Sequence, residues 1–247
     1  MYRELDEAAI ITTLRRLRQR IEERFPGSGL SRVASELEAI ARETEANVDY
    51  LRRPLWWARA LAGTFVLLVL ALLVTAILVL VGSFTDGASS FGEGLSERLQ
   101  GIEALVNDFV FLGIAIWFVF TIESRIKRRR ALRAIHELRS IAHIVDMHQL
   151  TKDPERLLSD QPDTASSPER NMTRDQLGRY LDYSAELLSH TSKLAALYVQ
   201  NFNDPVVLDT VSEVETLSSG LSSKIWQKIS TLHIHDAARP EPLELPD

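Results

Sequence analysis

Residues 60–85 read ALAGTFVLLVLALLVTAILVLVGSFT, a run of 26 residues without a charge. At about 1.5 Å per residue, a helix of this length exceeds the roughly 30 Å of a bilayer's hydrocarbon core. Buried helices of soluble proteins are seldom apolar on every side over such a length. Trp56 and Trp57 precede the run and suit the aromatic belt at a membrane interface, as interfacial anchors. The sequence therefore predicts a first membrane helix at residues 58–84.

A second apolar run, of 14 uncharged residues, follows at residues 109–122. Leu105, Val106 and Ile126 extend it if Asp108 and Glu123 lie near the two interfaces. A run this short also fits a re-entrant or interfacial helix. The basic residues that follow at once are typical of a stop signal, so we expect a second membrane helix at residues 105–126.

Basic residues lie on the outer sides of this helical hairpin. Residues 86–108 contain one basic residue, Arg98, against five acidic ones. Because basic residues stay on the cytoplasmic side, the sequence predicts a two-pass protein of the cell inner (plasma) membrane with both termini cytoplasmic and residues 85–104 as the outward connector. We expect the flanking cations to set this topology and to bind anionic lipid headgroups, at about 1 kcal/mol each; they are Arg52, Arg53, Arg125, Lys127, Arg128, Arg129, Arg130 and Arg133.

The remaining segments are predicted to form helices in the cytoplasm. Residues 1–53 carry two amphipathic stripes separated by Pro26-Gly27-Ser28-Gly29, which indicates a helical hairpin. Residues 114–153 contain neither Gly nor Pro, so we expect the second membrane helix to continue through residues 127–152 as one rod. Residues 153–172 are rich in Pro, Ser and Asp and are predicted to be a flexible linker.

The C-terminal region, residues 173–234, is predicted to be an antiparallel αα-hairpin. Thr173 and Gln176 have the spacing of a capping box, and Pro205 suits the first position of a second helix. Ser218 interrupts the apolar seam of that second helix. Residues 235–247 are predicted to be a disordered tail. Since two helices bury too little apolar surface alone, the sequence predicts an all-α protein in which the membrane hairpin joins a cytoplasmic helical bundle, with self-association into a homo-oligomer.

Candidate sites for chemistry are few. The absence of cysteine excludes disulfides and thiolate sites. The net charge of −6 and the position of the basic cluster beside an apolar run argue against nucleic-acid binding. His136, His143, Asp146 and His148 crowd one stretch and are weak candidates for half of a metal site or for a proton sensor, against the simpler interpretation of a polar helix face. A ring of Asp108 in an oligomer would attract cations at a pore mouth, against the simpler interpretation of a hydrated interfacial acid.

Two classes of function lead, and a metal-dependent enzyme built on the His136–His148 stretch is kept as an outlier. The first is a non-enzymatic membrane protein, without cofactor, whose cytoplasmic bundle associates with itself and with an unknown protein partner in a scaffold or regulatory role. The second is an oligomeric pore gated by the cytoplasmic helices, an arrangement loosely similar to two-helix membrane effectors of bacterial conflict systems. The run Phe65–Val81 has Thr75 as its one polar side chain, which argues against a pore.

Overall fold

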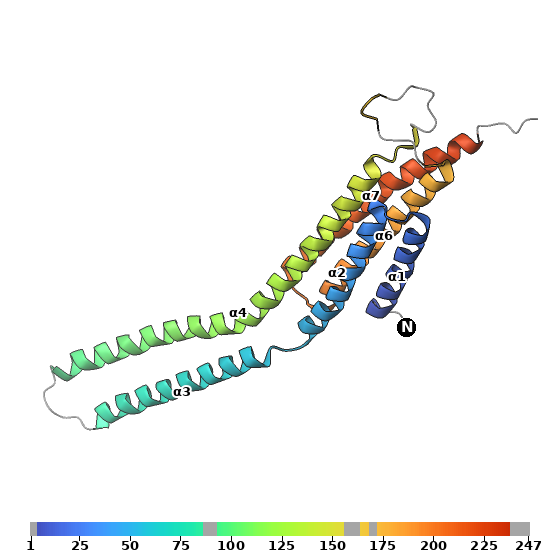
Figure 1. Cartoon of the computed structure of the whole chain (residues 1–247). Coiled ribbons are helices and arrows are strands. Elements are labelled where there is room, and N and C mark those ends of the chain that lie inside the picture. The colour runs from blue at the N-terminus through green and yellow to red at the C-terminus, as the bar shows by residue number, and fades with distance from the viewer. Residues whose placement is uncertain (1–3, 86–92, 156–163, 168–171, 238–247) are drawn as a thin grey trace, which may run out of the picture. The chain divides into compact units, whose positions relative to one another are not determined.

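The computed structural model describes residues 4–85, 93–155, 164–167 and 172–237, and all regular structure in these ranges is helical (Figure 1). The predicted all-α class is confirmed. The long described helices are α1 (Glu7–Arg24), α2 (Gly29–Arg52), α3 (Trp56–Thr85), α4 (Glu93–Leu150), α6 (Arg174–Asn201) and α7 (Pro205–Ala237).

The chain forms two compact units. The first contains residues up to Arg52 together with those from Arg130 onward, and the second contains Arg53–Arg129. Helix α4 is continuous over 58 residues and contributes to both; the absence of Gly and Pro from residues 114–153 predicted its continuity over the second half. In the part of the chain that the structure describes, no helix is both long and apolar enough to cross a membrane, so the spans expected at residues 58–84 and 105–126 gain no support there.

The N-terminal hairpin forms as its sequence predicted. The carboxylate of Asp6 accepts a hydrogen bond from the Ala9 N–H at 3.0 Å and caps α1. Gly27 adopts a φ of 64°, a left-handed conformation that favours glycine in the turn before α2. The predicted stripe of α1 is buried, and so is most of that of α2; the buried members are Ile10, Leu14, Leu17, Ile21, Leu30, Val33, Leu37 and Ala41.

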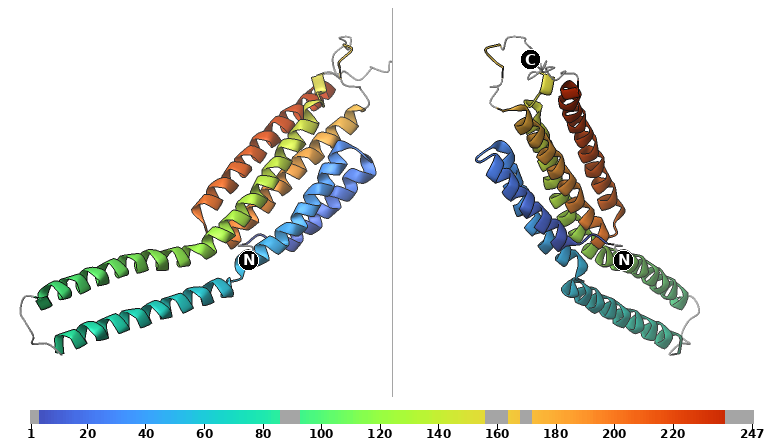
Figure 2. Two further views of the ribbon diagram at one scale, coloured as in Figure 1. Left: turned by 60° about the vertical axis from the view of Figure 1, so that its left-hand side comes forward. Right: turned by 90° about the vertical axis from the view of Figure 1, so that its right-hand side faces the viewer.

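Local capping defines the C-terminal hairpin. The Thr173 hydroxyl accepts a bond from the Gln176 N–H, and the Gln176 side chain accepts one from the Thr173 N–H, so the predicted capping box is confirmed. Asp204 caps α7 by accepting bonds from the N–H groups of Val206 and Val207. Figure 2 shows α6 and α7 side by side along their length. Ser218, which interrupts the apolar seam of α7 in the sequence, is buried.

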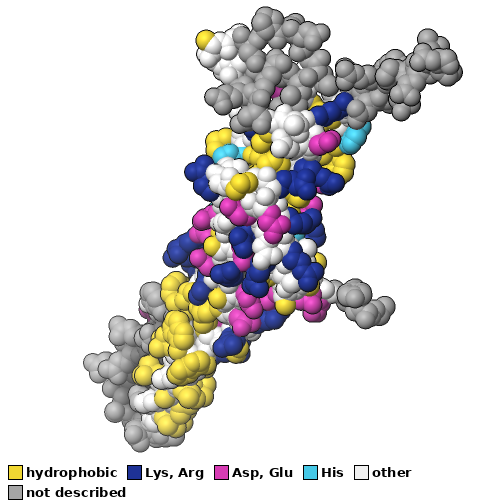
Figure 3. Space-filling model, turned by 45° about the vertical axis from the view of Figure 1, so that its right-hand side comes forward, with side chains coloured by type: hydrophobic (Ala, Val, Ile, Leu, Met, Phe, Trp, Pro, Cys, Tyr) yellow, Lys and Arg dark blue, Asp and Glu magenta, His cyan; other side chains and the backbone are white. Residues whose placement is uncertain are grey.

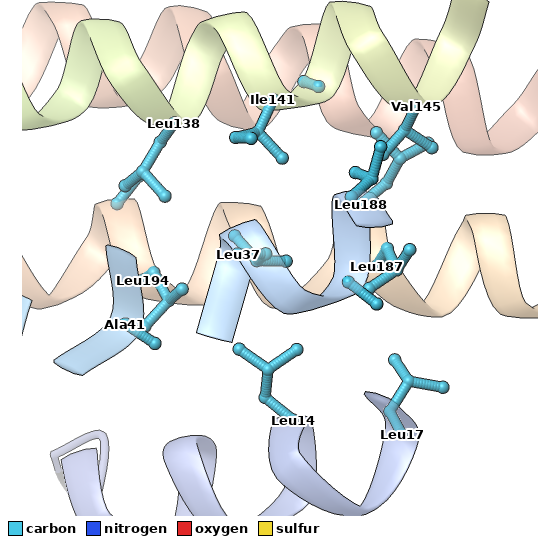
Figure 4. Close-up of a cluster of buried hydrophobic side chains, with 14 of the residues drawn as sticks. Leu14, Leu17, Leu37, Ala41, Leu138, Ile141, Val145, Leu187, Leu188 and Leu194 are labelled. Atoms are coloured by element: carbon cyan, nitrogen blue, oxygen red, sulfur yellow. The ribbon is translucent and has the colours of Figure 1, made fainter. Parts of the chain in front are cut away.

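One hydrophobic core joins both hairpins to the C-terminal part of α4. Leu138, Ile141 and Val145 of α4 face α6, with Val145 next to Leu188 (Figure 4). Leu14, Leu17 and Leu37 approach the same layer from α1 and α2. The predicted helical bundle is therefore present in the first unit. Burying a Leu or Ile completely contributes about 1.5–3 kcal/mol, so this shared core is the main source of the bundle's stability.

The expected linker and tail fall largely on residues outside the described ranges. Within residues 153–172, only 153–155, 164–167 and 172 are described. Helix α7 extends to Ala237, past the start of the tail predicted at residue 235. The connector predicted at residues 85–104 includes the first turns of α4, which begins at Glu93.

Candidate functional site

A carboxylate clasp closes the base of the α3/α4 hairpin in the second unit. Glu123 of α4 accepts a hydrogen bond from the backbone N–H of Leu55 at 3.3 Å and one from Arg59 Nε at 3.2 Å. Lys127 Nζ lies 3.0 Å from the same carboxylate, and its residue is only 7% exposed. Lys127, predicted to face lipid headgroups, is therefore engaged inside the protein. The clasp fixes the start of α3 against α4.

The second unit exposes a large apolar surface. Among the exposed aliphatic side chains of α3, the exposed fraction ranges from 46% at Ile77 to 68% at Leu67, whereas Val69 is buried. Figure 3 shows hydrophobic side chains over this region, while acidic and basic side chains mix over the bundle. The exposed large apolar residues between positions 61 and 81 are Leu61, Leu67, Leu68, Leu70, Leu72, Val74, Ile77, Leu78 and Val81. Water is a poor environment for such a surface.

Aromatic and basic side chains gather near the base of this surface. Trp56 and Trp57, the predicted interfacial anchors, are 76% and 47% exposed. The guanidinium of Arg125 lies 5.8 Å from the ring centre of Phe118 and 6.0 Å from that of Trp117, within the range of a cation–π contact. The other basic residues here are Arg53 and Arg129, which are exposed, and Arg128, which is half-buried.

Two of the arginines predicted to bind lipid headgroups make contacts within the bundle. Arg52 Nη2 lies 2.6 Å from Glu7 Oε1, and its Nε donates to Asn201 Oδ1. Arg130 Nε donates to Asn47 Oδ1 at 2.6 Å, and its guanidinium lies 4.3 Å from the Tyr50 ring centre. These contacts tie α2 to α6 and to α4. Arg133 is exposed.

The histidine-rich stretch of α4 does not converge on one site. His136 and His143 are exposed, whereas Asp146 accepts a bond from Gln149 Nε2 at 2.6 Å. The ring of His148 packs so closely on Gly29 that a Cβ there would collide with it. Among the described side chains, no group of three or more His, Asp or Glu residues could hold a metal ion. The side chain of Asp108, on which the pore hypothesis depends, lies outside the described part.

Sequence reasoning missed a buried carboxylate with three cationic partners. Glu38 of α2 is 4% exposed, and Arg18 and Arg42 each approach it to 2.5 Å, with Arg15 at 3.3 Å. Burial alone would raise the pKa of Glu38, but the hydrogen bonds from Arg42, Arg18 and Arg15 outweigh it and hold that pKa below the ordinary 4.5. Only the i, i+4 spacing of Glu38 and Arg42 was visible in the sequence.

A second missed contact closes the C-terminal end of α4. Lys228 of α7 donates to the backbone oxygens of Gln149 and Lys152 at 3.0 and 3.3 Å, and to Gln149 Oε1 at 2.7 Å. The last carbonyls of a helix lack partners within it, and a cation there also favours the helix dipole. Burial lowers the pKa of Lys228, and Asp153 and Asp146 partly oppose this shift.

One histidine of the core is held neutral. His190 of α6 is 7% exposed, and its Nδ1 has no hydrogen-bond partner among the described residues. Burial, together with the nearby cations Lys193 and Arg20, lowers the pKa of His190 to about 4. This ring therefore acts as an apolar core side chain at neutral pH.

The bundle also contains a groove at the start of α6. It has a volume of about 540 Å³ and is lined from three helices. Its residues are Arg24 of α1; Arg174, Asp175, Gly178, Arg179 and Asp182 of α6; and Trp226, Ile229, Leu232 and His233 of α7. No sequence pattern indicated this groove, because its walls come from residue 24, residues 174–182 and residues 226–233, which only tertiary packing brings together.

Comparisons of the chain with protein-family models, with curated proteins and with solved structures found no match in any of the three.

Proposed function

We propose that the chain is a non-enzymatic, two-pass inner-membrane protein whose cytoplasmic helical bundle mediates self-association and partner binding, in a scaffold or regulatory role. The observation that carries this proposal is the exposed apolar surface of α3. The proposal takes the whole uncharged run of residues 60–85 as one span, including the side chains outside the described part.

The size of the apolar surface makes an aqueous environment costly. Nine large apolar side chains of α3 are about half exposed or more. Complete burial of each contributes about 1.5–3 kcal/mol, so covering the exposed parts of all nine is worth on the order of 10 kcal/mol. That is as large as the net stability of a typical domain, about 5–15 kcal/mol. A hydrocarbon environment for α3 removes this cost.

The distribution of cations supports cytoplasmic termini. Arg53, Arg59, Arg125, Arg128 and Arg129 belong to the same unit as the apolar surface and flank its base in sequence. Exposed arginines at this level would contact anionic headgroups, and the paired ones would still count toward orientation. Helix α4 then links the span to the bundle without a break, so a displacement of one part would be transmitted to the other.

Single-cysteine labelling tests the topology directly, because the natural chain has no cysteine. Ser90→Cys lies in the predicted outward connector and Ser166→Cys in the predicted cytoplasmic linker. We expect a membrane-impermeant maleimide to label Ser90→Cys in intact bacterial cells, and to label Ser166→Cys only after lysis. Labelling of Ser166→Cys in intact cells, or release of the protein from membranes by alkaline carbonate, would refute the proposal.

Self-association is tested separately. Chemical crosslinking in native membranes should give a discrete ladder of homo-oligomers that persists on dilution with excess lipid. A protein that stays strictly monomeric would remove the self-association part of the proposal and leave the topology intact.

A further inference from the structure

We propose that the groove at the start of α6 binds a small organic phosphate, in which a phosphate group is carried on an aromatic or aliphatic body. This inference goes beyond the proposed function and stands without it, since every lining residue belongs to the helical bundle.

The charge of the groove selects an anion. Three guanidinium groups, from Arg24, Arg174 and Arg179, line it against two carboxylates, from Asp175 and Asp182. The ion pair between Arg179 and Asp182 is long, at 3.7 Å, and both side chains remain partly exposed. A ligand carboxylate has two oxygens and is satisfied by one guanidinium, whereas a ligand phosphate has three terminal oxygens and can accept hydrogen bonds from several guanidinium groups. The number of arginines therefore favours phosphate.

The opposite wall selects the body of the ligand. Trp226 is 55% exposed, while Ile229 and Leu232 beside it in α7 are nearly buried. A half-exposed indole next to aliphatic side chains offers a flat apolar surface on which an aromatic ring or alkyl chain can lie. A volume of about 540 Å³ lies in the range of small-molecule sites, about 300–1,000 Å³, and is larger than inorganic phosphate requires. Cations and an apolar wall together indicate an organic phosphate.

Gly178 lines the groove without a side chain of its own. A Cβ at this position would meet no heavy atom within 4 Å. Glycine inside a helix costs roughly 0.5–1 kcal/mol relative to alanine, so a larger side chain here should stabilise α6 while it fills the groove. A Cβ at Gly220 of α7 would also meet no heavy atom within 4 Å, but Gly220 does not line the groove. The pair provides a blocking variant and a matched control.

The test is a titration of the full chain, purified in detergent, with phenyl phosphate. In a variant whose Trp56, Trp57 and Trp117 are replaced by Phe, Trp226 is the one remaining tryptophan and reports the groove by fluorescence. We expect a saturable change with phenyl phosphate, weaker binding of inorganic phosphate, and none with phenol. Isothermal titration calorimetry on the chain with all its tryptophans should give the same Kd. The absence of saturation, or equal binding of phenol, would overturn the proposal.

Variants locate the site. Arg24→Gln and Gly178→Leu should each weaken phenyl phosphate binding about tenfold or more, the effect of losing one charged hydrogen bond or the space for the ring. Arg16→Gln, an exposed position of α1 outside the groove, and Gly220→Leu should leave Kd unchanged. Gly178→Leu should also raise Tm, which separates lost binding from misfolding. An unchanged Kd in Arg24→Gln and Gly178→Leu would overturn the proposal.

Discussion

Replacing Glu38 with glutamine should lower the free energy of unfolding of the bundle by about 2–3 kcal/mol at pH 7. Glu38 is almost fully buried, and its most buried partner, Arg18, is 29% exposed, so this pair should contribute about 1–1.5 kcal/mol. Arg15 and Arg42 are half exposed or more, and solvent screening limits each to about 0.5 kcal/mol. The rest of the expected loss of stability arises because the substitution leaves three guanidinium groups beside a neutral amide.

Urea unfolding of the full chain in detergent, followed by circular dichroism, measures this loss. Glu36→Gln is the matched control, because Glu36 is exposed on the same helix and should change stability by less than about 0.5 kcal/mol. The double variant with Arg18→Gln should reveal a coupling of about 1 kcal/mol. A Glu38→Gln variant as stable as the control, or a coupling near zero, would refute the reasoning.

Lowering the pH should reproduce the loss of stability that Glu38→Gln causes. The folded state holds the pKa of Glu38 below 4.5, so the unfolded chain takes up the proton first as pH falls. The stability that Glu38 contributes is therefore present above pH 4.5 and is lost as pH falls through the lowered pKa. Glu38→Gln should lack this part of the pH dependence.

Three further substitutions test other contacts of the bundle. Lys228→Met, which removes the donor to the end of α4, should cost about 1–2 kcal/mol in urea unfolding, and the exposed control Lys224→Met almost nothing. His190 has a pKa of about 4 in the folded protein, against an ordinary 6.5, so the unfolded chain binds the proton first as pH falls. The free energy of unfolding should therefore fall by on the order of 2 kcal/mol between pH 6.5 and pH 4. His190→Leu should reduce this pH dependence in thermal melts, and an unchanged dependence would contradict the prediction. Arg130→Gln should cost about 1 kcal/mol through its lost contacts, whereas Arg133→Gln should not, and equal losses would argue against the structural role of Arg130.

Local signals in the sequence predicted the helices well. The capping box at Thr173, the proline at the start of α7 and the stripe of α1 all act within a few residues, so their physical effect is legible in the chain itself. The continuity of α4 followed from the absence of Gly and Pro between residues 114 and 153. Each of these features depends on neighbours within one or two helical turns.

The candidate sites were harder to predict because their partners are distant in sequence. A charged residue such as Glu38, next to Leu37 in the stripe of α2, suggests a solvated position until arginines of α1 are known to reach it. Arg52 and Arg130 matched the pattern of lipid-facing cations, yet Glu7, Asn201 and Asn47 occupy their guanidinium groups. Sequence position and charge alone do not distinguish an arginine that binds a lipid headgroup from one that holds helices of the bundle together.

The circumference of α3 bears on whether lipid or a second copy of the chain covers its apolar surface. At about 100° per residue, and counting from Leu67, the exposed Leu68 and Leu72 lie near 100° and 140°, and Leu70 lies near 300°. The buried Val69 lies near 200°, on the side left between them. Exposed apolar side chains thus cover more than half of the helix, whereas packing against one further helix covers a stripe of only about 100°. One copy could not cover the surface, and a bilayer could cover all of it at once. Packing of α3 against one further helix would therefore leave part of this surface exposed, so under the proposed function we expect contacts between copies to lie in the bundle.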